Sequence, residues 1–291
     1  MDQDQRTPLP VNLSSGAGGW AAGGDWPWWM APAALFGAFV LANLAALVVD
    51  LPLVVAFGVK ISSKHTPPGI ELAGTAVQDF VFVGTAVWLA STRSRRPFSW
   101  EFGLRPTSFG RALGWLFNVL IGYLLFSLIW VQLVGSPREE VLESLGANQG
   151  AALLVLSALL TCVIAPICEE FLFRGFIFRA LCNWRGPWPA AILTGLMFGA
   201  VHLGSAPTVD LVPLAALGFG LCILRWRTGS LYPCIAAHAL NNSIAYGSQE
   251  GWLWWQVITL LCAAMALIWL LAFSLKRLGV ISPLPQTITE A

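Results

Sequence analysis

Charged residues are scarce in this sequence, and their scarcity decides the class of protein. Only 11% of the 291 residues are Asp, Glu, Lys or Arg, whereas 57% are hydrophobic. A soluble domain of this length would need more charge on its surface, so most of the chain must face lipid or other parts of itself. The net charge of +1 provides no basic field for nucleic acid. The composition predicts an all-α, polytopic helix bundle in the lipid bilayer.

Paired cysteines and the motifs of several protease classes are also absent. The six cysteines lie in or beside apolar runs, and none has the CxxC spacing of a metal or redox site. There is no HExxH motif of a zinc peptidase, no GxSG serine motif and no GxGD aspartate motif. The sequence therefore indicates neither a disulfide framework nor those three hydrolytic mechanisms.

The N-terminal segment lacks the charged region and short apolar region of a cleaved signal peptide. It begins MDQDQRTPLP and continues as a stretch rich in Gly, Ser and Ala. We expect residues 1–27 to form a disordered leader.

Eight apolar runs approach or exceed the about 20 residues that cross a bilayer. They lie near residues 28–59, 70–91, 111–135, 151–182, 187–204, 209–224, 230–248 and 252–275. The first contains Asp50 and Pro52, so we expect either one tilted helix or a span followed by an interfacial half-helix. The sixth is the weakest, because Gly218 and Gly220 lower its hydropathy, although small residues also suit close helix packing in lipid.

The basic residues alternate from one side of the predicted membrane to the other. The loops after odd-numbered runs hold only Lys60, Lys64 and Arg138. Those after even-numbered runs are richer, with Arg93, Arg95, Arg96, Arg105, Arg111, Arg179, Arg185, Arg225, Arg227, Lys276 and Arg277. The positive-inside rule places the even-numbered exits, and with eight spans both termini, in the cytoplasm.

Ionisable residues inside predicted spans are candidate functional residues. Asp50 and Asp79 are isolated, and a helix break or an interhelical hydrogen bond explains each of them. Two of the three histidines, by contrast, lie in separate spans, and a third span contains adjacent glutamates. The candidates are Glu169, Glu170, Arg174, His202, His238 and Asn242.

Helical spacing groups these candidates. Glu170 and Arg174, Phe198 and His202, and His238 and Asn242 are i,i+4 pairs, so each pair shares one helix face. At about 1.5 Å per residue from the cytoplasmic ends, Glu169, His202 and His238 all lie near mid-membrane. The spacing therefore predicts a polar cavity at that depth.

The adjacent glutamates are predicted to have different roles. Glu170 and Arg174 can neutralise each other on one face. Glu169 is rotated by about 100° from Glu170, so we expect that the two carboxylates do not serve the same partner. Glu169 is then free to act as a general base, and the two imidazoles and the Asn242 carboxamide can polarise water or stabilise an oxyanion.

Three segments resemble motifs of one family of membrane proteases. EEFLFR matches EExxxR, FGAVH matches FxxxH and HALNN matches HxxxN of the CAAX-prenyl-protease and bacteriocin-processing family, also called CPBP or Abi. The resemblance covers roughly residues 150–250. It divides the chain into the leader 1–27, N-terminal helices and loops 28–145, a catalytic core 146–250, a last span 251–276 and a tail 277–291.

The resemblance implies an intramembrane endopeptidase acting on a membrane-associated or lipidated protein or peptide. Glu169 with His238 would activate the hydrolytic water, and His202 with Asn242 would stabilise the oxyanion. Glu170, Arg174 and Phe198 would support these groups. The composition suggests a bacterial source, and hence the plasma membrane.

Two alternatives remain open from the sequence. Glu169, His202 and His238 could together bind zinc with one open coordination position. We nevertheless predict no cofactor, because no acidic residue lies within a helical turn of either histidine to serve as an outer-shell partner. The same polar groups could instead belong to a non-proteolytic scaffold or a transporter.

Overall fold

The computed structural model describes residues 23–56, 58, 67–93, 97–135 and 144–283, and helices make up most of this part of the chain. The N-terminal helices are α1 Met30–Ala56, α2 Pro68–Ser91 and α3 Phe109–Val134, with a 3₁₀ turn at Ser99–Phe102. The central ones are α5 Ala151–Leu159, α6 Ala165–Glu170 and α7 Phe178–Arg185. The C-terminal ones are α8 Pro187–Ala200, α9 Leu211–Thr228, α10 Tyr232–Gln249 and α11 Trp254–Arg277.

The predicted spans are confirmed as helices, with ends shifted by a few residues. The first is one continuous helix through Pro52 rather than a span with a separate half-helix. α5, α6 and α7 join through two π-helical turns into one composite helix, Ala151–Arg185. The weak sixth run forms α9, preceded by the 3₁₀ turn Thr208–Asp210.

By length and hydropathy, six helical segments of the described chain can cross a membrane. These are α1, α2, α3, the composite helix, the segment Thr208–Thr228 and α11. The other two expected spans are α8, which has only 14 residues, and α10, which carries many polar side chains. The chain is therefore a polytopic helix bundle. Two of its eight predicted spans, α8 and α10, are too short or too polar to cross a membrane as single helices.

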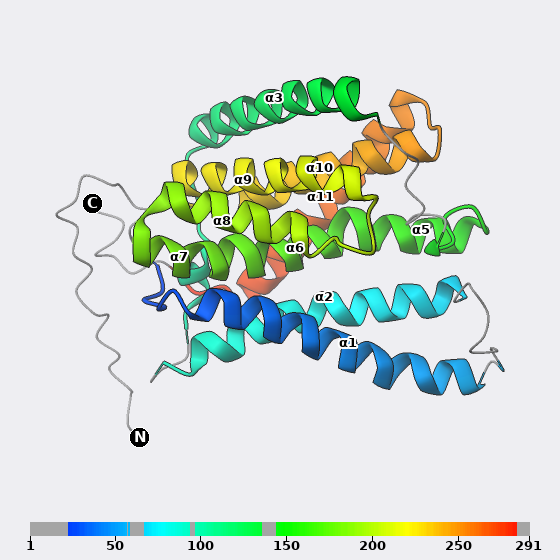
Figure 1. The fold of residues 1–291 in the computed structure, drawn as a ribbon, viewed down its shortest axis with the longest axis horizontal. Coiled ribbons are helices and arrows are strands. Elements are labelled where there is room, and N and C mark those ends of the chain that lie inside the picture. The colour runs from blue at the N-terminus through cyan, green and yellow to red at the C-terminus, as the bar shows by residue number, and fades with distance from the viewer. Residues whose placement is uncertain (1–22, 57, 59–66, 94–96, 136–143, 284–291) are drawn as a thin grey trace.

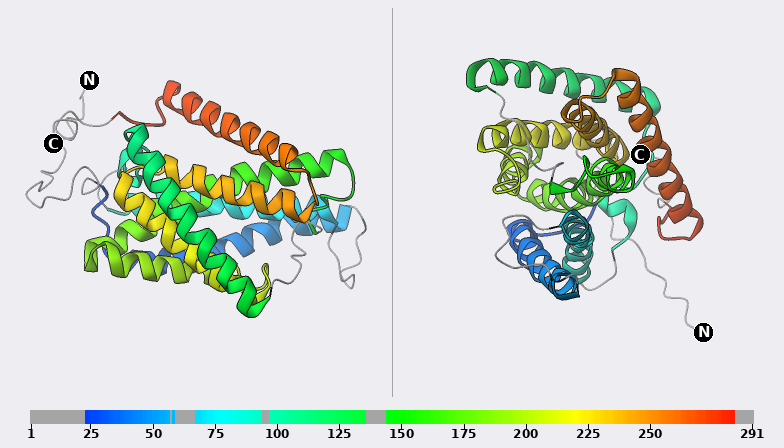
Figure 2. Two further views of the ribbon diagram at one scale, coloured as in Figure 1. Left: turned by 90° about the horizontal axis from the view of Figure 1, so that it is seen from above. Right: turned by 90° about the vertical axis from the view of Figure 1, so that its right-hand side faces the viewer.

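The composite helix runs between two groups of helices (Figure 1). On one side it packs against the pair α1–α2, and on the other against α8, α9 and α10. The other two views show α3 lying across α9, and α11 running along the outside of the bundle (Figure 2). The most apolar window of α3 has no buried residue, as expected for a helix that faces lipid.

Small side chains allow the first pair of helices to pack closely. The buried face of α1 presents Ala31, Ala34, Ala38 and Ala42. Alanines at this spacing let two helix backbones approach in a membrane, where lipid tails remove the usual hydrophobic driving force. α1 and α2 therefore form a closely packed support for one side of the composite helix.

The predicted leader 1–27 is only partly described. Residues 1–22 lie outside the described residues. In the remainder, Trp26 is buried, and the Asn183 side-chain amide donates to the carbonyls of Gly24 and Trp26 at 3.0 and 2.9 Å. Residues 23–27 are therefore packed on α7, and the prediction of disorder was wrong for them.

Candidate functional site

The adjacent glutamates lie at the end of α6, between two π-helical turns. The turn before α6 is Leu160–Ile164 and the turn after it is Phe171–Ile177. Insertion of such turns changes where neighbouring side chains point, and they are frequent at functional sites. Glu169 and Glu170 themselves belong to the α-helical residues between these turns, so the two side chains keep the rotation of about 100° between adjacent residues of an α-helix.

Glu170 forms the predicted pair with Arg174. Arg174 Nη1 donates to Glu170 Oε1 at 2.7 Å, and both side chains are fully buried. Arg174 Nη2 also donates to the Gly218 carbonyl at 3.1 Å, and the guanidinium lies 4.4 Å from the ring centre of Phe198. A buried cation needs this kind of multiple compensation. Arg174 thus ties the composite helix to α8 and α9.

His238 lies between the two glutamates. Its Nδ1 is 2.8 Å from Glu170 Oε1, while its Nε2 is 3.9 Å from Glu169 Oε2. The prediction that the two carboxylates do not serve one partner was therefore wrong. Arg174, Glu170, His238 and Glu169 form a polar chain, in which Glu170 Oε1 accepts hydrogen bonds from Arg174 and His238 and Glu169 lies 3.9 Å beyond His238. The His238 and Glu169 side chains are 4% and 16% exposed, so Glu169 is the more accessible end.

His202 reaches the site from the end of α8. That helix ends at Ala200, so His202 lies in the following turn rather than inside a helical span as predicted. Its Nδ1 is 2.8 Å from the Phe198 carbonyl, and its ring packs on the Phe198 ring, with centroids 5.0 Å apart. The His238 ring packs on the same Phe198 ring at 5.6 Å. Phe198 thus separates and positions the two imidazoles.

Asn242 contacts the composite helix one turn along α10 from His238. Its Nδ2 donates to the Thr161 carbonyl at 2.9 Å, and its Oδ1 accepts from Asn241 Nδ2 at 3.2 Å. The carboxamide nitrogen has two N–H groups, so one remains for another acceptor. Three of the four predicted catalytic side chains, those of Glu169, His238 and Asn242, therefore lie on or contact the composite helix, and His202 is linked to them through Phe198.

Asp79, which looks isolated in the sequence, is a further carboxyl group beside the site. It is 3% exposed on α2, and its Oδ2 has no hydrogen-bond partner among the described residues. It interacts electrostatically with Glu169 across the contact between α2 and α6. Its intramembrane position was the available signal, but the sequence did not show which helix it faces.

The partners of the two histidines fix their neutral tautomers. A carbonyl and a carboxylate only accept hydrogen bonds, so Nδ1 carries the proton in both rings. Each neutral ring then presents an unprotonated Nε2. His238 can accept a proton there, whereas His202 can donate from Nε2 only as an imidazolium.

Both histidines have outer-shell partners, contrary to the prediction from the sequence. Glu170 binds His238 Nδ1 from another helix, and the Phe198 carbonyl binds His202 Nδ1; both are common outer-shell arrangements. The positions of the three candidate ligands, however, do not favour a metal site. Among the residues that the structure describes, no three His, Cys, Asp or Glu side chains converge as a metal site requires. The alternative ligand set of Glu169, His202 and His238 is therefore not gathered around one point in this arrangement.

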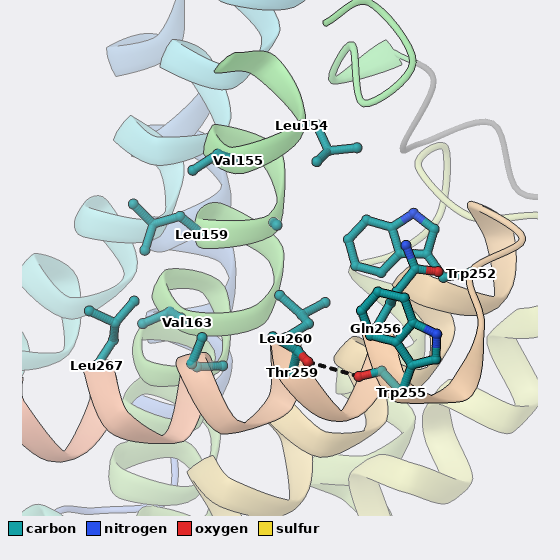
Figure 3. A pocket seen from close by; sticks show the side chains of 13 residues that line it. Leu154, Val155, Leu159, Val163, Trp252, Trp255, Gln256, Thr259, Leu260 and Leu267 are labelled. Atoms are coloured by element: carbon teal, nitrogen blue, oxygen red, sulfur yellow. Dashed lines mark hydrogen bonds between the residues drawn. The ribbon is translucent and has the colours of Figure 1, made fainter. Parts of the chain in front are cut away.

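Two apolar cavities follow the inner side of α11. Figure 3 shows the first, of about 460 Å³, whose walls include Leu159, Val163 and Leu260. The second, of about 300 Å³, is lined by Ile167 and Phe171, which bracket the two glutamates in sequence. Apolar space therefore lies between α11 and the segment that carries the two glutamates.

The family resemblance is confirmed for the segment that contains this site. Residues 151–244 match the family described as “Type II CAAX prenyl endopeptidase Rce1-like”. The match includes all three motifs and the helices from α5 to most of α10. It leaves α1, α2, α3 and α11 outside.

Several curated proteins are similar to this chain. An “Uncharacterized 24.3 kDa protein” of Escherichia coli is 30% identical over 41% of this chain and 58% of its own length. “Putative membrane peptidase YdiL” of Bacillus subtilis (strain 168) is 29% identical over 38% of this chain and 43% of its own. “Uncharacterized protein YyaK” of the same strain is 26% identical over 75% of both chains. The chain thus spans about half the length of the first two, and no solved structure matches it.

Proposed function

We propose, from the Rce1-like character of residues 151–244, that this chain is an intramembrane endopeptidase. Its substrate is a membrane-associated or lipidated protein or peptide, and its nucleophile is a water molecule activated by Glu169. The family match and the relative whose name describes a membrane peptidase support a protease in the membrane. The mechanism rests on the geometry of the polar chain.

The separation of Glu169 and His238 carries the proposal. At 3.9 Å, Glu169 Oε2 and His238 Nε2 are too far apart for a direct hydrogen bond. Both atoms are acceptors, and a water molecule with two hydrogens can donate one to each. Its lone pair then points away from both, toward a carbonyl carbon. Glu170 fixes the tautomer of His238 that this arrangement needs.

The reaction then needs donors for the oxyanion and a proton for the leaving group. As the water oxygen bonds to the carbonyl carbon, its proton moves to Glu169. The oxyanion accepts from the second N–H of Asn242, and His202 is assigned as the second donor, a role that requires its ring to take up a proton at Nε2 first. The C–N bond breaks as the proton passes from Glu169 to the amine nitrogen, which leaves a carboxylic acid and an amine.

A membrane proteome comparison tests whether the chain is a peptidase. Cells that carry the intact chain should contain shortened forms of a membrane-associated polypeptide. These forms should be missing with Glu169→Gln and present with the control Glu250→Gln, which changes a carboxylate outside the site. A scaffold or transporter would give the same polypeptide lengths in all three samples.

We expect cytoplasmic termini in a bacterial plasma membrane, with the loop from Arg93 to Arg111 on the same side. A cysteine placed at the exposed Ser108 should resist a membrane-impermeant thiol reagent in intact cells and react after lysis. A cysteine at the exposed Asn148, on the opposite side in this topology, should react in intact cells. The reverse pattern would invert the topology.

We also expect hydrolysis to persist without a bound metal ion, because the polar chain supplies a base and oxyanion donors. Purified protein is assayed after exhaustive chelation, with its metal content measured in the same samples. Activity should be unchanged in metal-free samples. Loss of cleavage that one equivalent of zinc restores would show that the site acquires a metal after rearrangement.

A further inference from the structure

We propose that Pro166 is a positioning residue: it leaves the Thr161 carbonyl without a backbone donor, and this carbonyl then holds the Asn242 carboxamide in place. The inference rests on the proposed function, since it concerns an oxyanion donor. It arises from the first π-helical turn and from one hydrogen bond between α10 and the composite helix. It explains why a proline lies inside that helix, three residues before Glu169.

The hydrogen-bond register of the π-helical turn exposes this carbonyl. The Ala165 N–H donates to the Leu160 carbonyl, an i+5 bond typical of a π-helix. In the same register, the Thr161 carbonyl would accept from the N–H of residue 166. Proline has no N–H, so the Thr161 carbonyl receives no backbone hydrogen bond there. Asn242 Nδ2 donates to this carbonyl instead, at 2.9 Å.

Pro166 also accounts for the wide turn itself. In a regular α-helix its ring would collide with the carbonyl four residues earlier, that of Cys162. A π-helical turn at Leu160–Ile164 relieves this contact by widening the backbone there. One residue therefore both widens the helix and leaves the carbonyl that faces α10.

The hydrogen bond to Thr161 fixes the orientation of Asn242. A carbonyl must receive an N–H, so the amide nitrogen lies toward the composite helix. The Asn241 side chain donates to the other end of the carboxamide at 3.2 Å. Because both the oxygen and the nitrogen of the Asn242 carboxamide are hydrogen-bonded, its second N–H points in a fixed direction. A donor fixed before the substrate arrives needs no reorganisation as charge develops on the oxyanion.

Pro166→Ala tests the inference because it gives Thr161 a backbone donor in either register. In a π-helical turn that donor is the N–H of residue 166, and in an α-helical turn it is the N–H of Ala165. Asn242 then competes for its anchor. We expect Pro166→Ala to lower kcat about tenfold with little change in KM, and Asn242→Ala to lower it about 10²- to 10³-fold. Pro187→Ala, at the start of α8, is the matched control and should behave as the intact chain.

Combining the two changes separates positioning from a general structural role. In the Asn242→Ala background, Pro166→Ala should change kcat by no more than about twofold, because the group that it positions is already missing. A tenfold loss that persists in that background would overturn the inference. So would full activity of Pro166→Ala.

Thermal unfolding in detergent gives a readout that does not need cleavage. Asn242→Ala should lower the unfolding temperature of the intact chain more than that of Pro166→Ala, in which Thr161 has a backbone partner. Equal shifts in both backgrounds would contradict the coupling. If the intact chain cleaves nothing, the proposed function fails, whereas unequal shifts would still support the link from Pro166 to Asn242.

Discussion

Replacing Glu169 with Gln is expected to lower the rate of peptide cleavage about 10²- to 10⁴-fold, the usual contribution of a general base. The amide cannot take the proton of the attacking water. Folding should be preserved, since Glu169 Oε2 has no hydrogen-bond partner among the described residues that the change would remove. The unfolding temperature in detergent should therefore stay close to that of the intact chain.

A kinetic assay on purified protein separates this loss from weaker substrate binding. The fall should appear in kcat, with KM little changed, because Glu169 acts on the water rather than on the substrate. Glu250→Gln provides a control for the same chemical change elsewhere. Full cleavage by a well-folded Glu169→Gln variant would assign the base to another residue.

The second large effect is expected on stability rather than on rate. Glu170→Gln should destabilise the fold by about 3 to 5 kcal/mol, because it leaves a buried cation without its counter-charge. Both Arg174 and Glu170 are fully buried, and no solvent can compensate for the loss. His238 loses its carboxylate at Nδ1 as well, so cleavage should also fall.

A double change tests the cause of this destabilisation. Glu170→Gln with Arg174→Met removes the unpaired cation while keeping much of its volume, and should recover part of the lost stability. Recovery should be incomplete, because Arg174 also donates to Gly218 and lies over Phe198. Thermal melts of the single and double variants provide the measurement. An unfolding temperature of Glu170→Gln equal to that of the intact chain would show that the ion pair contributes no net stability.

Much of the fold could be predicted from the sequence because apolar length and basic loops are properties of single segments. All eight runs form helices, and Glu170 pairs with Arg174, one helical turn away in the same chain segment. Local spacing also brought His202 to Phe198. In each of these cases the interacting residues are close in sequence, where helical geometry decides the contact.

The remaining features of the site depend on neighbours that are distant in sequence. The contact of Glu170 with His238 spans 68 residues, and the contact of Asn242 with Thr161 spans 81. The prediction that the two carboxylates do not serve one partner also failed, because an imidazole has two ring nitrogens: His238 meets Glu170 with Nδ1 and Glu169 with Nε2. Asp79 was visible as an intramembrane carboxyl, but only the packing of α2 on α6 relates it to Glu169.

The short helix α8 has a consequence for how the chain enters the bilayer during synthesis. Its 14 residues extend about 21 Å, less than the about 30 Å of the hydrocarbon core. It lies so close to α9 that a Cβ added at Gly195 or Gly199 would come within 2.7 or 2.6 Å of a carbonyl oxygen of Ala215 or Leu211. We therefore expect the insertion machinery to release α8 and α9 together, as a hairpin, so that His202 reaches the membrane interior only after α9 has been translated.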